Sequence, residues 1–149
     1  LQGAAPADDH GKNGIRDALL LKARKLTCEE YRQLQRHTVI GAQILSGSQD
    51  PTIQMAERIA LSHHENWDGS GYPNGLCGGQ IPIEAQVVSI VDVYDAQLSD
   101  RVYRRGLPEE EVLDNINEQI GIKFSPKLGN LFMDCLDEIK SQCWACLVR

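Results

Sequence analysis

Apolar residues recur at three- and four-residue steps through several long stretches of the chain, the spacing that places them on one side of an α-helix. Residues 27–30 have the form of a capping box, and the steps that follow predict a helix over about residues 27–45. Asp50 and Pro51 supply an N-cap and a first-turn proline, so we expect a second helix to run to about Asn66. No segment alternates apolar and polar residues as a half-buried strand does, and the pattern therefore predicts an all-α fold.

A glycine-rich loop interrupts the helical pattern. Residues 68–79 contain five glycines and a proline, a composition that regular structure does not tolerate. The next helix, over about residues 82–98, is apolar on nearly every side, and we predict that it forms the buried centre of the fold. Two further helices are expected to begin at Pro108 and at Ser125–Pro126.

Length and composition place the chain among single soluble domains. It has 149 residues, and no apolar run approaches the roughly 20 residues of a membrane span. The five cysteines are odd in number and unevenly spread, which argues against a disulfide framework and predicts a cytoplasmic location. A net charge of −6 opposes binding of polymeric nucleic acid, but it leaves open a small phosphate ligand held by a local basic cluster.

Three histidines and an aspartate stand at positions predicted to face inward, and these are His37, His63, His64 and Asp92. A lone buried histidine is more often a core residue than a ligand, and a lone buried aspartate is more often part of an ion pair. Imidazole and carboxylate without thiolate favour iron or manganese over structural zinc. Adjacent residues of an α-helix point about 100° apart, so His63 and His64 are poorly placed to share one ion. We therefore predict a site with two or more metal ions.

Basic residues suggest how an anionic substrate could be held. Lys12 follows Asp9 by one helical turn, close enough to meet a phosphate beside the metal ions. Arg101 and Arg104 belong to the densest basic cluster of the chain, and arginine pairs well with phosphate. The alternatives are a surface lysine and a solvated helix end.

Three sequence blocks in a fixed order are recognisable, namely HHE at residues 63–65, DGSGYP at residues 68–73 and DVYDA at residues 92–96. With these blocks the chain resembles the HD-GYP family, a branch of the HD phosphohydrolases, over about residues 4–136. The resemblance implies a single compact helical domain with a metal centre in the core of the bundle and a GYP loop. We expect this domain to span residues 1–142, truncated at its N-terminus, with a tail over residues 143–149.

The resemblance also implies an activity, the hydrolysis of the bacterial second messenger cyclic di-GMP to pGpG or GMP by two or three iron or manganese ions. Asp8 stands where the family has the histidine of its HD pair, and we expect it to bind a metal ion there. The implied metal ligands are Asp8, Asp9, His37, His63, His64 and Asp92. The implied catalytic residues are Lys12 and Asp9, and the implied dinucleotide-binding residues are Tyr72, Arg101 and Arg104.

A second interpretation is a degenerate module that binds a cyclic dinucleotide, or a diguanylate cyclase with a GGDEF domain through its GYP loop, without turnover. Asp8 favours this alternative, as does the lack of the Glu and His that the family takes from a preceding helix. The intact His37, His63, His64 and Lys12 favour a phosphodiesterase. We take the enzyme as the main prediction.

Overall fold

Five α-helices build the part of the chain that the computed structural model describes, which is residue 11, residues 26–100 and residues 105–147. These helices, with a short 3-10 helix η3 (Gly78–Gln80), are α2 (Cys28–Leu45), α3 (Pro51–Ser62), α4 (Ile83–Leu98), α5 (Glu109–Glu118) and α6 (Pro126–Leu147). Within these ranges there is no β-strand, and one isolated bridge joins Ile120 to Phe124. The all-α prediction is confirmed.

The predicted helix starts are confirmed by their caps. Thr27 and Glu30 form the capping box, in which Glu30 N–H donates to Thr27 Oγ1 at 3.3 Å and Thr27 N–H donates to Glu30 Oε2 at 2.9 Å. Asp50 Oδ1 accepts a hydrogen bond of 2.7 Å from the backbone of Thr52 in the first turn of α3. These side chains satisfy backbone donors that a helix N-terminus otherwise leaves unpaired.

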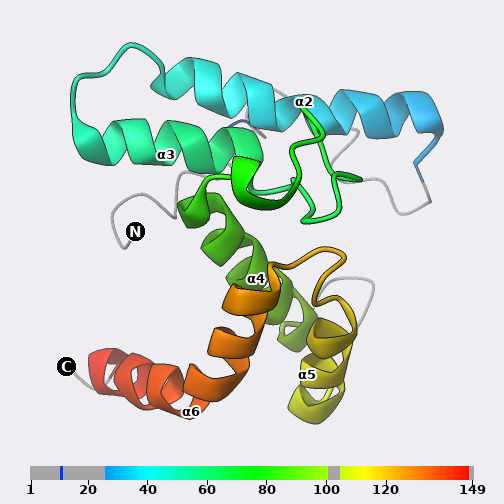
Figure 1. Cartoon of the computed structure of the whole chain (residues 1–149), viewed down its shortest axis with the longest axis vertical. Helices are drawn as coiled ribbons and strands as arrows, with labels where there is room; N and C mark the ends of the chain where they lie inside the picture. Colours follow the sequence, from blue (N-terminus) through cyan, green and yellow to red (C-terminus); the bar gives the residue numbers. More distant parts are fainter. Residues whose placement is uncertain (1–10, 12–25, 101–104, 148–149) are drawn as a thin grey trace.

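The helices form two groups joined by α4. Figure 1 shows α2 and α3 lying side by side as an antiparallel pair, with α5 and α6 packed around the far part of α4. One buried hydrophobic cluster contains Ile59 of α3 and Val88 of α4, and the other contains Ile90 of α4 and residues of α5 and α6. Because α4 supplies side chains to both clusters, it carries apolar residues on more than one side.

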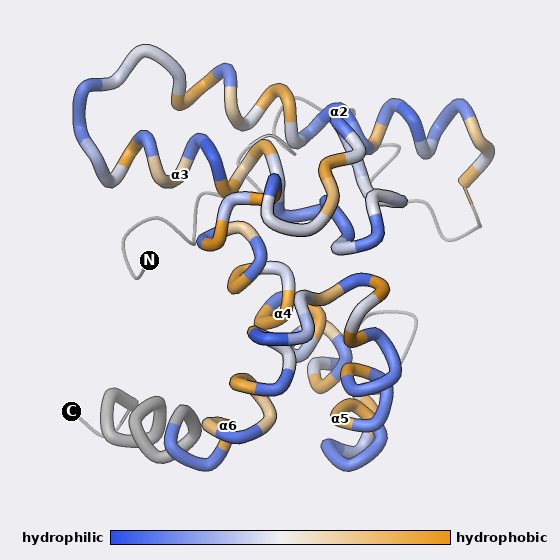
Figure 2. Tube along the Cα trace, viewed as in Figure 1, coloured by the Kyte–Doolittle hydropathy of each residue, from blue (hydrophilic) through white to orange (hydrophobic). Residues whose placement is uncertain are grey.

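Helix α4 lies between the two hydrophobic clusters, as predicted for the centre of the fold, but part of its surface is exposed. Ile83 is 64% exposed and Val91 is 47% exposed, although Ala85 and Ile90 are buried. Helices cover α4 on the sides that face the two clusters, and Val91 instead lines an apolar groove between α4 and α6. In Figure 2 hydrophobic segments on α4 accordingly alternate with hydrophilic ones.

Two further observations bear on the organisation of the chain. No helix within the described ranges combines the length and the apolar character that crossing a membrane requires. Helix α6 continues to Leu147, past the predicted boundary at residue 142. The limits of the domain therefore stay a prediction.

Candidate metal centre

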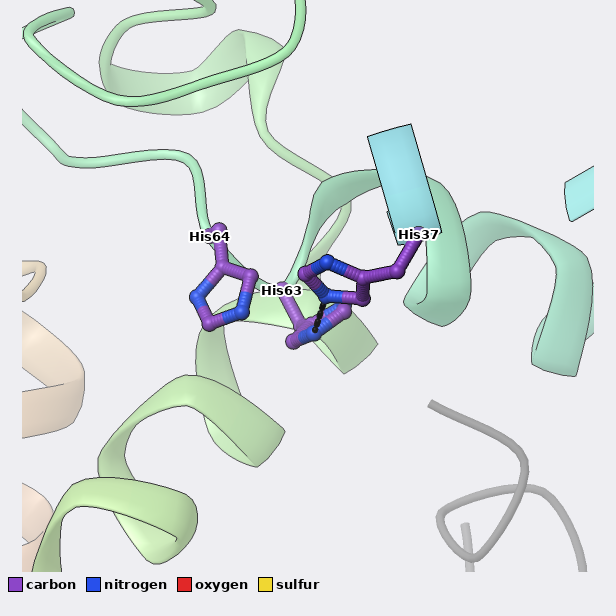
Figure 3. A group of neighbouring side chains, drawn as sticks. All are labelled: His37, His63 and His64. Atoms are coloured by element: carbon purple, nitrogen blue, oxygen red, sulfur yellow. Dashed lines mark hydrogen bonds between the residues drawn. The ribbon is translucent and has the colours of Figure 1, made fainter. Parts of the chain in front are cut away.

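Three imidazole rings meet where α2 passes the end of α3. His37 lies within α2, His63 caps the C-terminus of α3, and His64 follows it. One ring nitrogen from each of the three lies within 4.8 Å of the others. His37 is 1% exposed and His63 is 2% exposed, whereas His64 is partly exposed, so the group reaches from the interior toward the surface. Figure 3 shows the three rings gathered from two segments far apart in the sequence.

The end of α3 explains how two neighbouring residues reach the same place. The predicted helix to Asn66 is too long, because α3 ends at Ser62 and the chain turns at His63 and His64. A hydrogen bond of 3.0 Å from Glu65 N–H to Ser62 O closes this turn. The ring centroids of His63 and His64 lie 4.1 Å apart. The angular argument against a shared ion therefore fails, since it assumed that both residues lie within a helix.

The hydrogen bonds of the buried rings determine which nitrogens face the centre. His37 Nδ1 lies 2.7 Å from Leu34 O, and His63 Nδ1 lies 3.0 Å from Ile59 O. A carbonyl oxygen only accepts, so each Nδ1 carries the proton and each neutral ring keeps a lone pair on Nε2. Backbone carbonyls commonly orient metal-binding histidines in this way.

The two Nε2 atoms point at each other across a short distance. His37 Nε2 and His63 Nε2 are 3.4 Å apart, as the dashed line in Figure 3 marks. With both Nδ1 atoms protonated, a hydrogen bond between the two Nε2 atoms needs a further proton on one ring, and a cation between the two nitrogens would take the place of that proton. Two nitrogens on one tetrahedral ion with bonds of about 2.0–2.1 Å are separated by about 3.3 Å. The separation of the His37 and His63 nitrogens therefore fits one divalent transition-metal ion, and His64 offers a third nitrogen nearby.

The glycine-rich loop places an aromatic ring next to these histidines. Tyr72 stacks on His64 with centroids 4.8 Å apart and an interplanar angle of 29°, and its N–H donates to His64 O at 3.1 Å. The base of the loop is held by Trp67, whose N–H donates to Lys123 O and whose carbonyl accepts from Gly78 N–H. Hydrogen bonds from Ser70 hold the pKa of Asp68 below its usual value. The loop is thus an ordered wall of the site.

Glycine is required where this loop crosses its own start. A Cβ atom on Gly71 would lie 2.3 Å from the backbone nitrogen of Asn66 and 2.5 Å from Glu65 Cα. Gly11 lies equally close to α2, since a Cβ atom added to it would lie 1.8 Å from the carbonyl oxygen of His37. Both glycines therefore allow backbone contacts that place segments beside the histidines.

Glu65 has a role that the sequence patterns did not predict. Its side chain is buried, and its two carboxylate oxygens accept hydrogen bonds from Asn74 N–H at 2.8 Å and Leu76 N–H at 3.0 Å. These bonds fasten the far side of the loop to the segment that carries His63 and His64. The one sequence feature that could have drawn attention to Glu65 is its position directly after two predicted metal ligands.

Asp92 differs from the expectation that its carboxylate is buried. It is exposed on α4 and is not a member of the group of three histidines. A charged neighbour is Lys123, whose pKa is lowered by burial and raised in part by Asp92. Lys123 is thus a charged neighbour of Asp92, and the metal-binding role of Asp92 stays a prediction.

The other predicted site residues lie outside the described part of the chain. These are Asp8, Asp9, Lys12, Arg101 and Arg104. Their roles stay predictions.

Comparison with known proteins supplies an independent view of the chain. The model of a family described as "HD domain" matches residues 4–128. The chain is 45% identical over 139 residues to a cyclic di-GMP phosphodiesterase of Thermotoga maritima, covering 93% of this chain and 38% of that protein. It is 46% identical over 127 residues to the cyclic di-GMP phosphodiesterase response regulator RpfG of Xanthomonas campestris, covering 85% and 34%.

A third relative has a different substrate in its name. The 3'3'-cGAMP-specific phosphodiesterase 2 of Vibrio cholerae is 40% identical over 138 residues, which cover 93% of this chain and 26% of that protein. The chain thus spans well under half the length of each of these three relatives.

Solved structures share the fold at lower sequence identity. An HDG"Y"P protein from Bdellovibrio bacteriovorus superposes with a TM-score of 0.62 at 22% identity, over 87% of this chain and 40% of that chain. A cyclic GMP-AMP specific phosphodiesterase of Vibrio cholerae superposes with a TM-score of 0.60 at 18% identity, over 88% and 36%.

Proposed function

The chain belongs to the HD domain family, and from this premise we propose that it is a metal-dependent phosphodiesterase that hydrolyses cyclic di-GMP to pGpG or GMP. The observation that carries the proposal is the meeting of three imidazoles with two Nε2 atoms 3.4 Å apart. Relatives at 45% and 46% identity are named cyclic di-GMP phosphodiesterases, which supports turnover over the degenerate alternative.

We propose two or three metal ions in the centre, the number that the family resemblance implies, and we propose iron or manganese because imidazole and carboxylate ligands without thiolate suit these metals. A bound divalent ion would neutralise phosphate charge and lower the pKa of water. His37 and His63 hold their rings in place through carbonyl hydrogen bonds, so little reorganisation accompanies binding. The proposed metal ligands are Asp8, Asp9, His37, His63, His64 and Asp92.

The remaining proposed residues hold the substrate. Lys12 contacts the scissile phosphate and, with Asp9, forms the catalytic pair. Tyr72 contacts the dinucleotide from the glycine-rich loop, where its ring already lies against His64. Arg101 and Arg104 are proposed to pair with phosphate or base edges.

The proposal also has a cellular part. A cytoplasmic location fits a cysteine pattern that does not resemble a disulfide framework. A diguanylate cyclase is the protein partner that we propose for the loop tip, where Asn74 and Gly75 are exposed.

Metal analysis combined with a hydrolysis assay tests the proposed function. Protein purified without oxygen is expected to contain two or more iron or manganese ions and to convert cyclic di-GMP to pGpG or GMP. His63→Ala should lose metal and activity together, whereas Gln33→Ala, an exposed change on α2, should retain both. Comparing kcat/KM for cyclic di-GMP and 3'3'-cGAMP identifies the preferred substrate.

One result would contradict the proposal, and one variant would then identify its cause. Tight binding of cyclic di-GMP without product, in fully loaded protein, would support the degenerate module. Recovery of turnover in Asp8→His would then identify the substituted HD histidine as the cause.

A further inference from the structure

A row of aromatic rings leads from the surface to the three histidines. Tyr31, in the first turns of α2, contacts Tyr72 edge to face, with centroids 6.3 Å apart and an interplanar angle of 76°. Tyr72 in turn stacks on His64 at 4.8 Å and lies 6.4 Å from the ring of His37. Tyr31 is therefore separated from the candidate metal centre only by the ring of Tyr72. In the sequence it lies six residues before His37.

Tyr31 is poorly explained by packing. Its side chain is 48% exposed, and it belongs to neither of the two hydrophobic clusters of the described residues. It nevertheless has a defined position, because the capping box orders the start of α2 and the Tyr31 N–H donates to Thr27 O at 2.8 Å. An exposed ring on a rigid element, beside a second ring, is suited to binding a flat ligand.

The chemistry of the ring indicates which part of a nucleotide it would contact. Phosphate groups are bound by metal ions and by cationic side chains, and tyrosine offers neither. Nucleobases stack on aromatic rings, and this contact is tolerant of base identity because every base has a π-face. A dinucleotide whose phosphate lies at the histidines must place its bases to the side of them.

We propose that Tyr31 is a nucleobase-binding residue, whose exposed ring forms with Tyr72 an aromatic edge on which one purine base of the substrate stacks. The proposal rests on the proposed function, since it takes the histidine cluster as the place where the phosphate binds. It adds a base subsite supplied by α2, the same helix that supplies His37.

Equilibrium binding of two matched ligands tests this subsite without any turnover. GMP and ribose 5-phosphate carry the same phosphate and sugar, and only GMP has a base. In calorimetric titrations of the Mn²⁺-loaded full chain, Tyr31→Ala should weaken GMP binding about tenfold, the size of one stacking contact, and leave ribose 5-phosphate unchanged. Tyr31→Phe should bind GMP like the wild type because it keeps the ring.

Two controls separate stacking from a loss of structure. Ile44→Ala removes another exposed apolar side chain of α2, which is 60% exposed, and should change neither affinity. Tyr31→Leu keeps apolar bulk without the π-face, and it should weaken GMP binding as Tyr31→Ala does. Manganese content and thermal midpoint should stay at the wild-type value in all four variants.

Several results would overturn the base subsite. These are unchanged GMP affinity in Tyr31→Ala and Tyr31→Leu, equal weakening of both ligands, a loss in Tyr31→Phe as large as in Tyr31→Ala, and no preference of the wild type for GMP over ribose 5-phosphate. A wild type that binds GMP through Tyr31 but leaves cyclic di-GMP intact would refute the proposed function and keep the subsite. The two failures are therefore distinguishable.

Discussion

At the scale of single residues, hydrogen bonds decide what each site residue can do. His37 and His63 donate from Nδ1 to carbonyls of their own helices, which directs both Nε2 lone pairs toward the same point. Glu65 accepts from two backbone amides of the loop and so serves as an anchor rather than a ligand of the histidine group. Adjacent residues in one motif thus perform different physical tasks.

Glu65→Gln is expected to loosen the loop. A glutamine side chain has one acceptor oxygen, and its amide nitrogen is a donor. One of the two backbone N–H groups that Glu65 accepts from would therefore face another donor and lose its hydrogen bond. We expect the free energy of unfolding to fall by about 1–3 kcal/mol and the Asn74 or Leu76 amide to exchange hydrogen faster. Urea denaturation and amide exchange measure the two effects.

Glu118→Gln, an exposed change on α5, is the control for this substitution. It should alter neither stability nor exchange in the loop. Wild-type exchange rates at both Asn74 and Leu76 in Glu65→Gln would show that the carboxylate does not hold the loop.

At the scale of helices, the end of α3 and its contact with α4 shape the site. α3 ends at Ser62, which frees His63 and His64 to converge, and Arg58 near that end forms an ion pair with Glu84 in the first turn of α4. The Arg58 side chain is 48% exposed and the Glu84 side chain is 12% exposed. This ion pair holds α4 against the end of α3, directly before His63 and His64.

The Arg58–Glu84 pair is expected to stabilise the fold in a pH-dependent way. Burial raises the pKa of Glu84, but its own backbone amide and Arg58 outweigh burial and lower the pKa below 4.5. A carboxyl with a lowered pKa in the folded state contributes stability above its unfolded pKa, and this is lost as pH falls through the folded pKa. Arg58→Met should therefore cost about 0.5–1 kcal/mol near neutral pH and less in acid.

Chemical denaturation at a series of pH values measures this difference. Arg32→Met is the matched control, because Arg32 and Glu29 pair at 3.7 Å with side chains 75% and 70% exposed. Its cost should be smaller, since solvent screens exposed pairs. A cost of Arg58→Met that stays constant from neutral to acidic pH would contradict the assigned ion pair.

At the scale of the whole molecule, the histidine centre joins parts of the chain that are distant in sequence. His37 and His63 are 26 residues apart and approach only when α2 packs on α3. An ion bound by both would therefore stabilise the folded chain over the unfolded one.

Mn²⁺ is accordingly expected to raise the thermal midpoint. At about 100 times the dissociation constant, linkage predicts roughly 2.7 kcal/mol, or about 5–10 °C for a domain of this size. His63→Ala should abolish most of this rise, and Mg²⁺ at the same concentration should produce little of it. Differential scanning fluorimetry after removal of metal with a chelator measures the effect, and an undiminished rise in His63→Ala would contradict imidazole ligation.

Local sequence signals suffice to predict the helices that begin with a cap, the glycine-rich loop and the histidines that meet. Caps such as Thr27 and Asp50 act on their own first turns, so neighbouring residues suffice to predict them. The HHE and DGSGYP blocks likewise need no tertiary contact to be recognised.

The packing of the folded chain sets where α3 ends, which sides of α4 are covered, and what Glu65 binds. The turn after Ser62 brings His63 and His64 together, and the exposure of Val91 and Asp92 depends on where α5 and α6 pack. These outcomes arise from contacts between segments far apart along the chain, and helical periodicity carries no information about which partner covers a given face. For the same reason, the contact between Tyr31 and Tyr72 cannot be predicted from the sequence, because it depends on how the loop packs against α2.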